Sequence, residues 1–305
     1  MMLTIDSPPP AEARATAGGL ESSAGAARAG TTGEADPKAA PSAAYFLRAG
    51  KAPVSILETV IGEDERARIL ETAAAPWRMI CNLRFQGPLG AGVGTGWLVG
   101  PTTVLTAGHC VHDPRIGGWA TQITVTPGLN RDRRPHGQVI ARRFSSTQSW
   151  IADQNEDHDL GVIHLDADAT PVDRDSAALG DALGFFGLAV RSDADLAGSF
   201  IHVAGYPGEL ARGFGKEMWG HRSRVTAVTE RRVFYDVDTT AGQSGGPAFT
   251  IEDDPARPTA VAIHAYGTGG TPAHLGIIAN SAPRITTEVF DMIERWIDSG
   301  AGRGR

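Results

Sequence analysis

From residue 77 onward, short apolar runs rich in β-branched residues alternate with turns of Gly, Pro, Asn and Asp. Runs of this length and spacing favour an all-β barrel or sandwich over a helical bundle. The 38 glycines and 19 prolines suit the many turns of such a fold. The predicted strands are 79–85, 96–99, 103–106, 122–127, 137–144, 160–165, 200–205, 218–228, 233–237, 247–250 and 259–266.

The two ends of the chain differ from this central part. Residues 1–50 are rich in Ala, Gly, Pro, Ser, Thr and Glu, so they cannot bury enough apolar surface to offset the entropy of ordering. We expect residues 1–58 to form a disordered N-terminal pro-segment. Near the other end, apolar residues recur at helical spacing, which predicts an amphipathic C-terminal helix over 286–298.

Composition argues against several classes of function. The net charge of −7 gives no support to binding of nucleic acid or of an anionic membrane. No apolar run approaches the roughly 20 residues that span a bilayer, and no standard secretory signal is visible at the N-terminus. His109 and His112 have a spacing seen in some metal sites but lack the helical context, so we expect neither a metal nor another cofactor.

Three short motifs carry residues suited to nucleophilic catalysis. His109 lies in Thr-Ala-Gly-His-Cys, Asp159 opens an apolar run, and Ser244 lies in Gly-Gln-Ser-Gly-Gly-Pro. A serine hydroxyl needs an imidazole to take its proton, and the imidazole needs a carboxylate to fix its tautomer. Alone, each motif has an ordinary structural explanation, as a core histidine, a turn end or a tight turn. Together, in this chain order, they predict a catalytic triad with the order found in the chymotrypsin fold.

The glycines around Ser244 have a predicted role of their own. A tetrahedral intermediate develops an oxyanion, which is best met by backbone N–H groups that already point at it. A glycine-rich turn permits that backbone geometry. Gly242 and Ser244 are therefore the predicted oxyanion-hole donors.

These motifs resemble those of the trypsin-like serine peptidases and, within them, the bacterial glutamyl endopeptidases. The resemblance runs from about residue 59 to about residue 298 and includes the segments 95–101, 205–208 and 238–239. It implies a peptidase domain over 59–300, built of two six-stranded antiparallel β-barrels of the chymotrypsin type (roughly 59–185 and 186–284) and the C-terminal helix. It also implies a secreted or extracytoplasmic zymogen, a monomer that cleaves protein or peptide substrates through an acyl-enzyme.

The resemblance extends to a specificity pocket and a processing site. In glutamyl endopeptidases a histidine and a threonine bind the acidic side chain of the substrate, and the matching residues here are His264 and Thr239. They imply cleavage after Glu and, less well, after Asp. The alternatives are a hydrogen-bonded core histidine and a strand packing residue. Thr59 matches the mature N-terminus of the family, so cleavage between Glu58 and Thr59 would suit the same preference and suggests self-processing.

The two cysteines depart from the family pattern. Bacillus members carry a cysteine just before the Thr-Gly-Trp motif, bonded to the one after the catalytic histidine. Gly94 occupies that position here, whereas Cys110 is kept. Cys81 lies on the preceding predicted strand, so a Cys81–Cys110 disulfide is the candidate pairing. Two other readings of the function stay open: a serine peptidase of other specificity and a non-catalytic trypsin-fold binding module.

Overall fold

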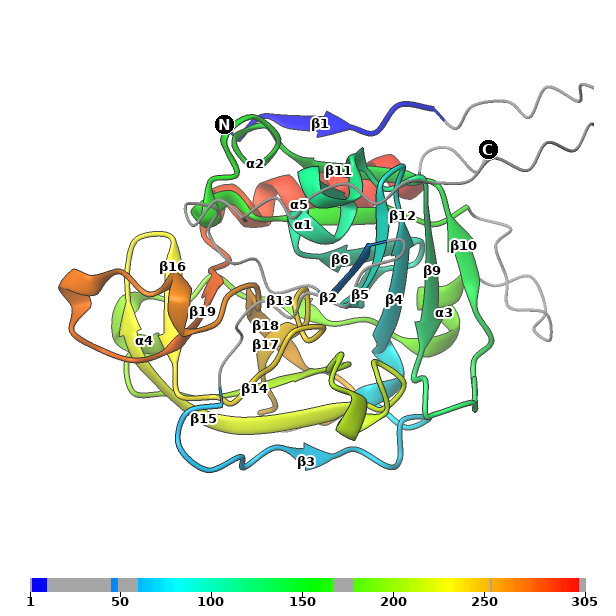
Figure 1. The fold of residues 1–305 in the computed structure, drawn as a ribbon. Helices are drawn as coiled ribbons and strands as arrows, with labels where there is room; N and C mark the ends of the chain where they lie inside the picture. Colours follow the sequence, from blue (N-terminus) through cyan, green and yellow to red (C-terminus); the bar gives the residue numbers. More distant parts are fainter. Residues whose placement is uncertain (1, 10–44, 49–59, 167–177, 253, 302–305) are drawn as a thin grey trace, which may run out of the picture.

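The computed structural model describes residues 2–9, 45–48, 60–166, 178–252 and 254–301. Most of its regular structure is β, arranged in two large, mainly antiparallel sheets with few helices (Figure 1). The predicted all-β class with two barrels and a C-terminal helix is confirmed.

The first sheet closes into a barrel because one strand is bent. Its β10 pairs with β9 and its β11 pairs with β12, and only Arg142 separates β10 from β11. Counted as one bent strand, they join the two ends of the sheet, which gives six strands. The barrel strands are β4 (Ile80–Gln86), β5 (Gly90–Gly100), β6 (Thr103–Thr106), β9 (Gln122–Pro127), β10 (Val139–Ala141), β11 (Arg143–Thr147) and β12 (Gly161–His164).

The second sheet closes in a similar way. Isolated bridges between Ala262 and Arg284 and between Tyr266 and Ser281 join the β18 end of the sheet to the β19 end. Six strands again form the barrel. They are β14 (Phe200–Gly205), β15 (Trp219–Val228), β16 (Arg232–Tyr235), β17 (Pro247–Thr250), β18 (Thr259–Ile263) and β19 (Asn280–Pro283).

Short additional strands decorate both barrels, and two of them correct an expectation. The disorder expected over 1–58 is wrong for β1, which pairs with β11, and for β2, which pairs with β5. Both strands pair with edges of barrel strands that are otherwise unpaired. Amino-acid composition alone does not predict such a tertiary contact. Apart from residues 2–3 and 7–9, which flank β1, the rest of the expected pro-segment lies outside the described residues. The additional strands are β1 (Thr4–Asp6), β2 (Tyr45–Arg48), β3 (Ala67–Arg68), β7 (His112–Asp113), β8 (Gly118–Trp119) and β13 (Gly187–Leu188).

The helices are short except for the last. The predicted C-terminal helix is present as α5, and its buried residues Val289, Met292, Ile293 and Trp296 follow helical spacing. The α-helices are α1 (Gly108–Val111), α2 (Gln148–Asp153), α3 (Leu179–Leu183), α4 (Asp193–Leu196) and α5 (Thr287–Ala301). The 3₁₀ turns are η1 (Trp77–Met79), η2 (Pro114–Ile116), η3 (Glu156–His158), η4 (Leu210–Arg212), η5 (Thr268–Gly270) and η6 (Ala273–Leu275).

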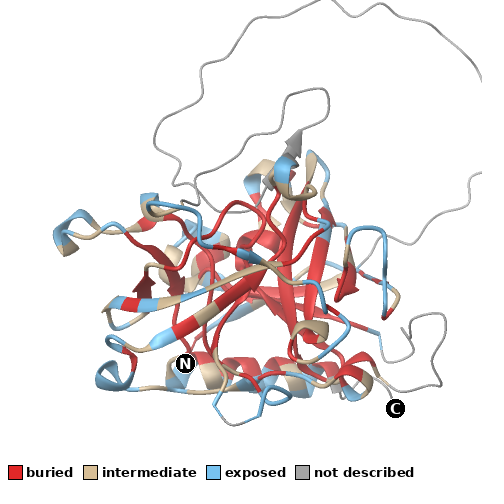
Figure 2. Ribbon diagram, turned by 90° about the horizontal axis from the view of Figure 1, so that it is seen from below, coloured by how far each residue is buried: buried red, intermediate tan, exposed pale blue. Residues whose placement is uncertain are grey.

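Three main hydrophobic clusters hold these parts together (Figure 2). One fills the first barrel and one fills the second. The third lies between them, where Trp97 of β5 and Phe249 of β17 join the apolar face of α5. Because this shared cluster packs both barrels against one helix, it sets the position of each barrel relative to the other.

Candidate active site

The pairing of β6 with β12 brings His109 and Asp159 together. Gly161 lies opposite Thr106. Asp159, two residues before Gly161, therefore lies beside the start of α1, the helix that carries His109. Hydroxyl groups of β11 hold the segment around Asp159, since Ser146 donates to the Leu160 carbonyl and Thr147 to the His158 carbonyl (2.8 and 2.6 Å). The position of the carboxylate therefore follows from strand register and two side-chain hydrogen bonds.

Asp159 is fully buried and accepts three hydrogen bonds. Its Oδ2 lies 2.6 Å from His109 Nδ1, and its Oδ1 accepts the His109 backbone N–H at 2.8 Å. The third donor is the hydroxyl of Tyr266, 2.6 Å from Oδ2. Burial and the neighbouring Asp159 charge raise the pKa of Tyr266 well above its usual value, so the phenol stays protonated and donates. These three donors satisfy the buried carboxylate and fix its orientation toward His109.

His109 has the environment of a general base. Its burial opposes protonation, but the adjacent Asp159 charge outweighs that effect and holds the pKa of His109 well above its usual value. With Nδ1 bonded to the carboxylate, Nε2 is the nitrogen left to take a proton. Nε2 is buried and makes no hydrogen bond within the described part of the chain. Such bonds often tighten only once substrate is bound.

The turn that carries Ser244 is fixed from both barrels. Thr95 of β5 donates its hydroxyl to the Gly242 carbonyl and its backbone N–H to the Ser244 carbonyl, both at 2.8 Å. In the second barrel, His264 directly follows β18, and its carbonyl accepts the Gly245 N–H at 2.7 Å. The nucleophile of the second barrel is thereby tied to the barrel that carries the histidine.

Gly242 needs its missing side chain at this turn. Its φ is +103°, and a Cβ there would lie 2.5 Å from the Tyr206 carbonyl oxygen. Only glycine combines that backbone angle with so close an approach. The turn therefore presents the peptide groups on either side of Gln243 in a fixed orientation, as the predicted oxyanion-hole donors Gly242 and Ser244 require.

The predicted pocket residues lie next to this turn. His264 is buried, and its backbone N–H donates to the Gly246 carbonyl at 2.8 Å. Tyr235 Oη lies 2.5 Å from His264 Nδ1. The Thr239 hydroxyl is fully buried and has no hydrogen-bond partner among the residues that the structure describes. An unpaired buried hydroxyl is costly unless something binds it.

Tyr266, Tyr235 and Arg66 are functional candidates that the sequence did not single out. Each makes its contact across long sequence separations, with Asp159, His264 and the nucleophile turn. The one signal in the sequence was that both tyrosines flank apolar strand residues.

The candidate triad and pocket side chains are all buried. His109, Asp159, Ser244, Thr239 and His264 have no exposed surface. The predicted processing residues Glu58 and Thr59 lie outside the described residues.

The disulfide expectation is wrong, although the strand register behind it was correct. Cys81 does lie opposite Gly96 on β5, but Cys81 and Cys110 are both free and buried. Leu83, not Cys81, faces Gly94, and a Cβ on Gly94 would be 2.8 Å from Cys110 Sγ. The partner position of Cys110 is therefore occupied by glycine.

Within the described ranges, one group of side chains has the spacing of metal ligands. It comprises Glu65, His221 and Asp238, whose ligand atoms lie within 4.8 Å of one another. Both Asp238 oxygens already accept backbone N–H groups, from Ile61 at 2.7 Å and Glu65 at 2.9 Å, and His221 Nδ1 accepts the Asp238 N–H at 2.8 Å. Asp238 and His221 thus already have hydrogen-bond partners within the fold, which give the group a structural role.

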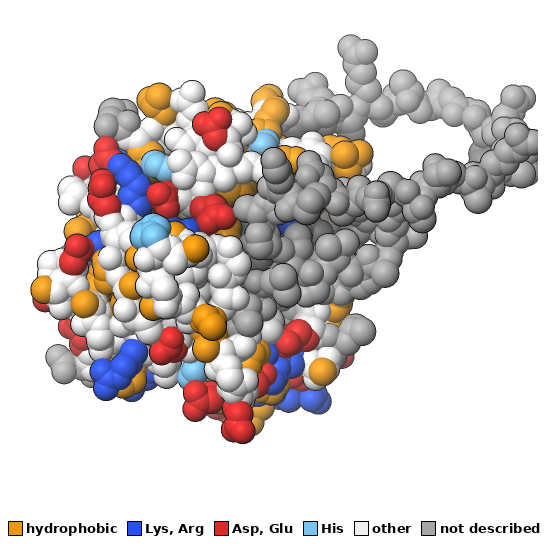
Figure 3. All heavy atoms as spheres, turned by 60° about the vertical axis from the view of Figure 1, so that its left-hand side comes forward, with side chains coloured by type: hydrophobic (Ala, Val, Ile, Leu, Met, Phe, Trp, Pro, Cys, Tyr) orange, Lys and Arg blue, Asp and Glu red, His pale blue; other side chains and the backbone are white. Residues whose placement is uncertain are grey.

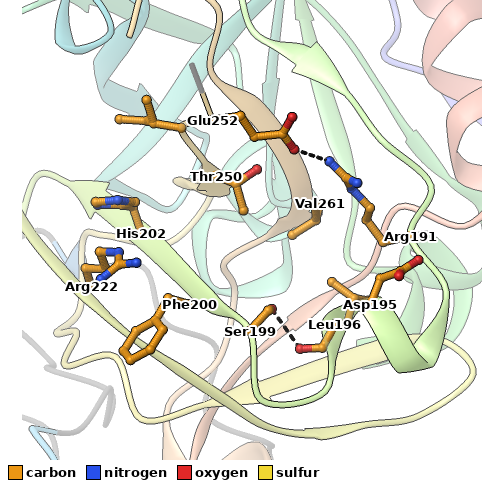
Figure 4. Close-up of a pocket in the computed structure, with 11 residues that line it drawn as sticks. Arg191, Asp195, Leu196, Ser199, Phe200, His202, Arg222, Thr250, Glu252 and Val261 are labelled. Atoms are coloured by element: carbon orange, nitrogen blue, oxygen red, sulfur yellow. Dashed lines mark hydrogen bonds and ion pairs between the residues drawn. The ribbon is translucent and has the colours of Figure 1, made fainter. Parts of the chain in front are cut away.

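A separate cavity of about 290 Å³ lies on the second barrel (Figure 4). An ion pair joins Arg191 to Glu252 at its rim, and the Arg222 guanidinium packs 4.4 Å from the Phe200 ring centre. None of the candidate catalytic residues lines it. On the face shown in Figure 3, acidic, basic and apolar side chains are interspersed over the coloured part of the surface.

No helix in the described ranges is both long enough and apolar enough to cross a lipid bilayer.

Comparison with known proteins agrees with this site. A trypsin-like peptidase domain matches residues 94–254, more than half of the 305 residues. The chain is 34% identical over 252 residues to a glutamyl endopeptidase of Bacillus licheniformis, covering 82% of this chain and 72% of that protein. It is 32% identical over 240 residues to a Bacillus subtilis protein named extracellular metalloprotease, covering 78% and 69%.

A solved structure described as Glu endopeptidase in complex with MPD shares the fold. It matches with a TM-score of 0.65 and 25% identity, covering 79% of this chain and all of that chain. Family, relative and fold agree with the buried His–Asp pair and the glycine-rich serine turn. This chain therefore belongs to the trypsin-like peptidases and is a serine endopeptidase that acts on protein or peptide substrates.

Proposed function

We propose that the protein cleaves peptide bonds after glutamate and, less well, after aspartate, with His109, Asp159 and Ser244 as its triad. The observation that carries the proposal is the histidine at the nucleophile turn: His264 is buried, bonded to Tyr235 and joined by its backbone to Gly246. Two of the most similar known proteins are named for glutamyl activity.

The proposed mechanism follows from the hydrogen bond between His109 Nδ1 and Asp159, which leaves Nε2 to accept the serine proton. His109 Nε2 takes the proton of Ser244 as Oγ attacks the scissile carbonyl, and Asp159 stabilises the imidazolium that forms. The Gly242 and Ser244 N–H groups bind the oxyanion. His109 then gives the proton to the leaving amine, and water hydrolyses the acyl-enzyme by the same steps in reverse.

The preference for an acidic residue follows from the pocket. With the Tyr235 hydroxyl donating to Nδ1, His264 keeps its proton on Nε2 and can donate it to a carboxylate. The Thr239 hydroxyl, which lacks a partner among the described residues, offers a second donor. A buried carboxylate is tolerated only when it is hydrogen-bonded or paired, so both donors favour Glu over apolar side chains.

Matched peptides test this specificity. Four chromogenic peptides that differ only in the last residue before the cut (Glu, Asp, Gln, Arg) would be assayed with the processed enzyme. We expect Glu to be cleaved fastest, and His264→Ala to lose at least about tenfold in kcat/KM for Glu, the scale of one hydrogen bond to a charged group. Fastest cleavage after Gln or Arg would reject the glutamyl assignment and leave a serine endopeptidase of other specificity.

We further propose that the enzyme is a secreted monomer made as a zymogen and cut between Glu58 and Thr59. Support comes from the buried triad and from Asp238, which accepts the N–H groups of Ile61 and Glu65 just after that bond. The name of one relative includes the word extracellular. Size-exclusion chromatography with light scattering on the culture supernatant checks both secretion and monomeric state.

A further inference from the structure

Arg66 is a buried cation directly beneath the nucleophile turn. Its side chain has no exposed surface. It precedes β3, whose two residues pair with Trp219 and Gly220 of β15, so the strand holds Arg66 against the second barrel. A charged group is rarely buried to this degree unless paired, and here the pairing partners connect it to the site.

One side of the guanidinium reaches the turn itself. Nη1 donates to Thr240 Oγ1 at 2.6 Å and to Gln243 Oε1 at 3.0 Å. Gln243 Oε1 also accepts the Thr240 N–H at 3.1 Å, which closes the turn into a small ring of hydrogen bonds. Gln243 is the residue between Gly242 and Ser244, so this contact bears on the two peptide groups proposed to bind the oxyanion.

The other side of the guanidinium is neutralised by acids. Nε and Nη2 donate to the two Asp64 oxygens at 2.9 and 2.8 Å, and Nη2 lies 3.2 Å from Glu209 Oε2. The hydrogen bond from Arg66 holds the pKa of Asp64 well below its usual range, so that carboxylate stays charged. Arg212 bonds to both acids and stacks 4.0 Å from the Trp219 ring centre, which balances two cations with two anions.

We infer that Arg66 is a positioning residue that holds the oxyanion-hole turn, residues 240–244, in its catalytic shape. The planar guanidinium is suited to this role because its donors point in fixed directions and engage Thr240, Gln243 and Asp64 at once. The inference rests on the proposed roles of Gly242 and Ser244. It adds a specific cause for the orientation of Gly242 and Ser244. That cause is the contact made by Arg66, which lies a few residues after the proposed processing site.

The test compares Arg66→Met with a matched variant, Arg68→Met. Arg68 lies on β3 two residues away, is partly exposed, and bonds to Asn130 at 2.9 Å and Glu217 at 3.4 Å, not to the turn. Both would be assayed on whichever peptide the wild type cleaves best, so the outcome does not depend on glutamate preference. Rates would be normalised by active-site titration and by circular dichroism at the assay temperature.

We expect Arg66→Met to lose between about 10- and 100-fold in kcat with KM changed by less than about threefold, since removing one oxyanion donor outright costs about 10²–10³. Inhibition by a peptide aldehyde, which mimics the tetrahedral state, should weaken by the same factor as kcat. Arg66→Lys should recover part of the loss. Arg68→Met should match the wild type.

Equal kcat values for Arg66→Met and the wild type would overturn the inference. So would a loss of kcat that leaves aldehyde affinity intact, because that pattern would separate Arg66 from the oxyanion hole. If Arg66→Met does not fold, Thr240→Val gives the answer: the inference requires a fall in kcat of several fold. A wild type that cleaves no peptide would instead reject the proposed function.

Discussion

At the residue scale, the Asp159 carboxylate, which accepts hydrogen bonds from Tyr266 and His109, sets the basicity of the His109 imidazole. His109 must be neutral to accept the serine proton, and its pKa is raised well above the usual value by Asp159 against the effect of burial. Activity falls at low pH as the general base becomes protonated, and this fall is the acidic limb of the pH–rate profile. Raising the pKa of the base moves the limb to higher pH. We therefore expect kcat/KM of the processed enzyme to rise with a midpoint above about pH 6.5, the ordinary histidine value. A pH–rate profile with a midpoint below that value would contradict this.

Replacing Tyr266 with Phe should move the same limb further. Without the phenol, the Asp159 charge acts more fully on the imidazolium, so the pKa of His109 rises and the limb shifts to higher pH. The loss of a buried hydrogen bond to a charged group should also lower the free energy of unfolding by about 1.5–3 kcal/mol. Tyr235→Phe is the matched comparison, because it removes a buried phenol from His264 and should change KM for Glu without moving the limb. An unshifted limb in Tyr266→Phe would assign that residue to packing alone.

At the element scale, much of the fold follows from local patterns. The strands predicted over 103–106, 122–127, 200–205 and 247–250 agree residue for residue with β6, β9, β14 and β17. The strand β19 was missed because its Asn and Pro are poor strand formers, and its place is set by pairing with β16. β1 was missed because its support is remote: Asp6 and Ser7 bond to Ser145 and Phe144 of β11.

The residues of the candidate site likewise fall into two groups, those that local motifs indicated and those that only the fold brings into place. The members of the proposed triad were picked out because each lies in a distinctive local motif, and the structure places His109 beside Asp159. Tyr266 and Arg66 could not be picked out in this way: Tyr266 contacts Asp159 of the other barrel, and Arg66 contacts a turn 174 residues further along the chain. The disulfide failed at the level of one strand position, because Leu83, not Cys81, lies opposite Gly94.

The same register predicts that a disulfide can be restored. A Cβ at position 94 would lie 2.8 Å from Cys110 Sγ, near the spacing of about 3 Å between a Cβ and its partner sulfur within a disulfide. Gly94→Cys should therefore bond to Cys110 and close a loop of about 15 residues, worth about 3 kcal/mol. Intact mass before and after reduction checks the bond, and thermal unfolding should show a Tm higher by about 5–10 °C.

Gly94→Ala is the control for this bridge, since it adds the Cβ without the thiol. Crowding against Cys110 should leave its Tm at or below that of the wild type. A free thiol count of three in Gly94→Cys under oxidising conditions would refute the predicted geometry.

At the scale of the whole molecule, the N-terminal part of the chain is bound to the domain it precedes. β1 lies along β11 and β2 along β5 (Figure 1). The candidate triad is fully buried. Together with the Asp238 anchor just after Thr59, this arrangement supports an inactive precursor that cleavage opens. Activation of the proposed zymogen would then act on both barrels, through strand pairing in the first and the Arg66 network in the second.

Self-processing gives a direct prediction. N-terminal sequencing should find Thr59 as the first residue of the wild type expressed in a protease-free host, whereas Ser244→Ala should keep its original N-terminus. Identical processing of both proteins would mean that another peptidase does the cutting.

The central claim is that Ser244 serves an endopeptidase that cuts after glutamate. Mass-spectrometric mapping of every cut made by the processed enzyme in a denatured protein tests it most directly, with Ser244→Ala as the blank. The account predicts cuts chiefly after Glu, a minority after Asp, and none with the variant. Cuts chiefly after Arg or Phe, or an unchanged pattern with Ser244→Ala, would contradict it.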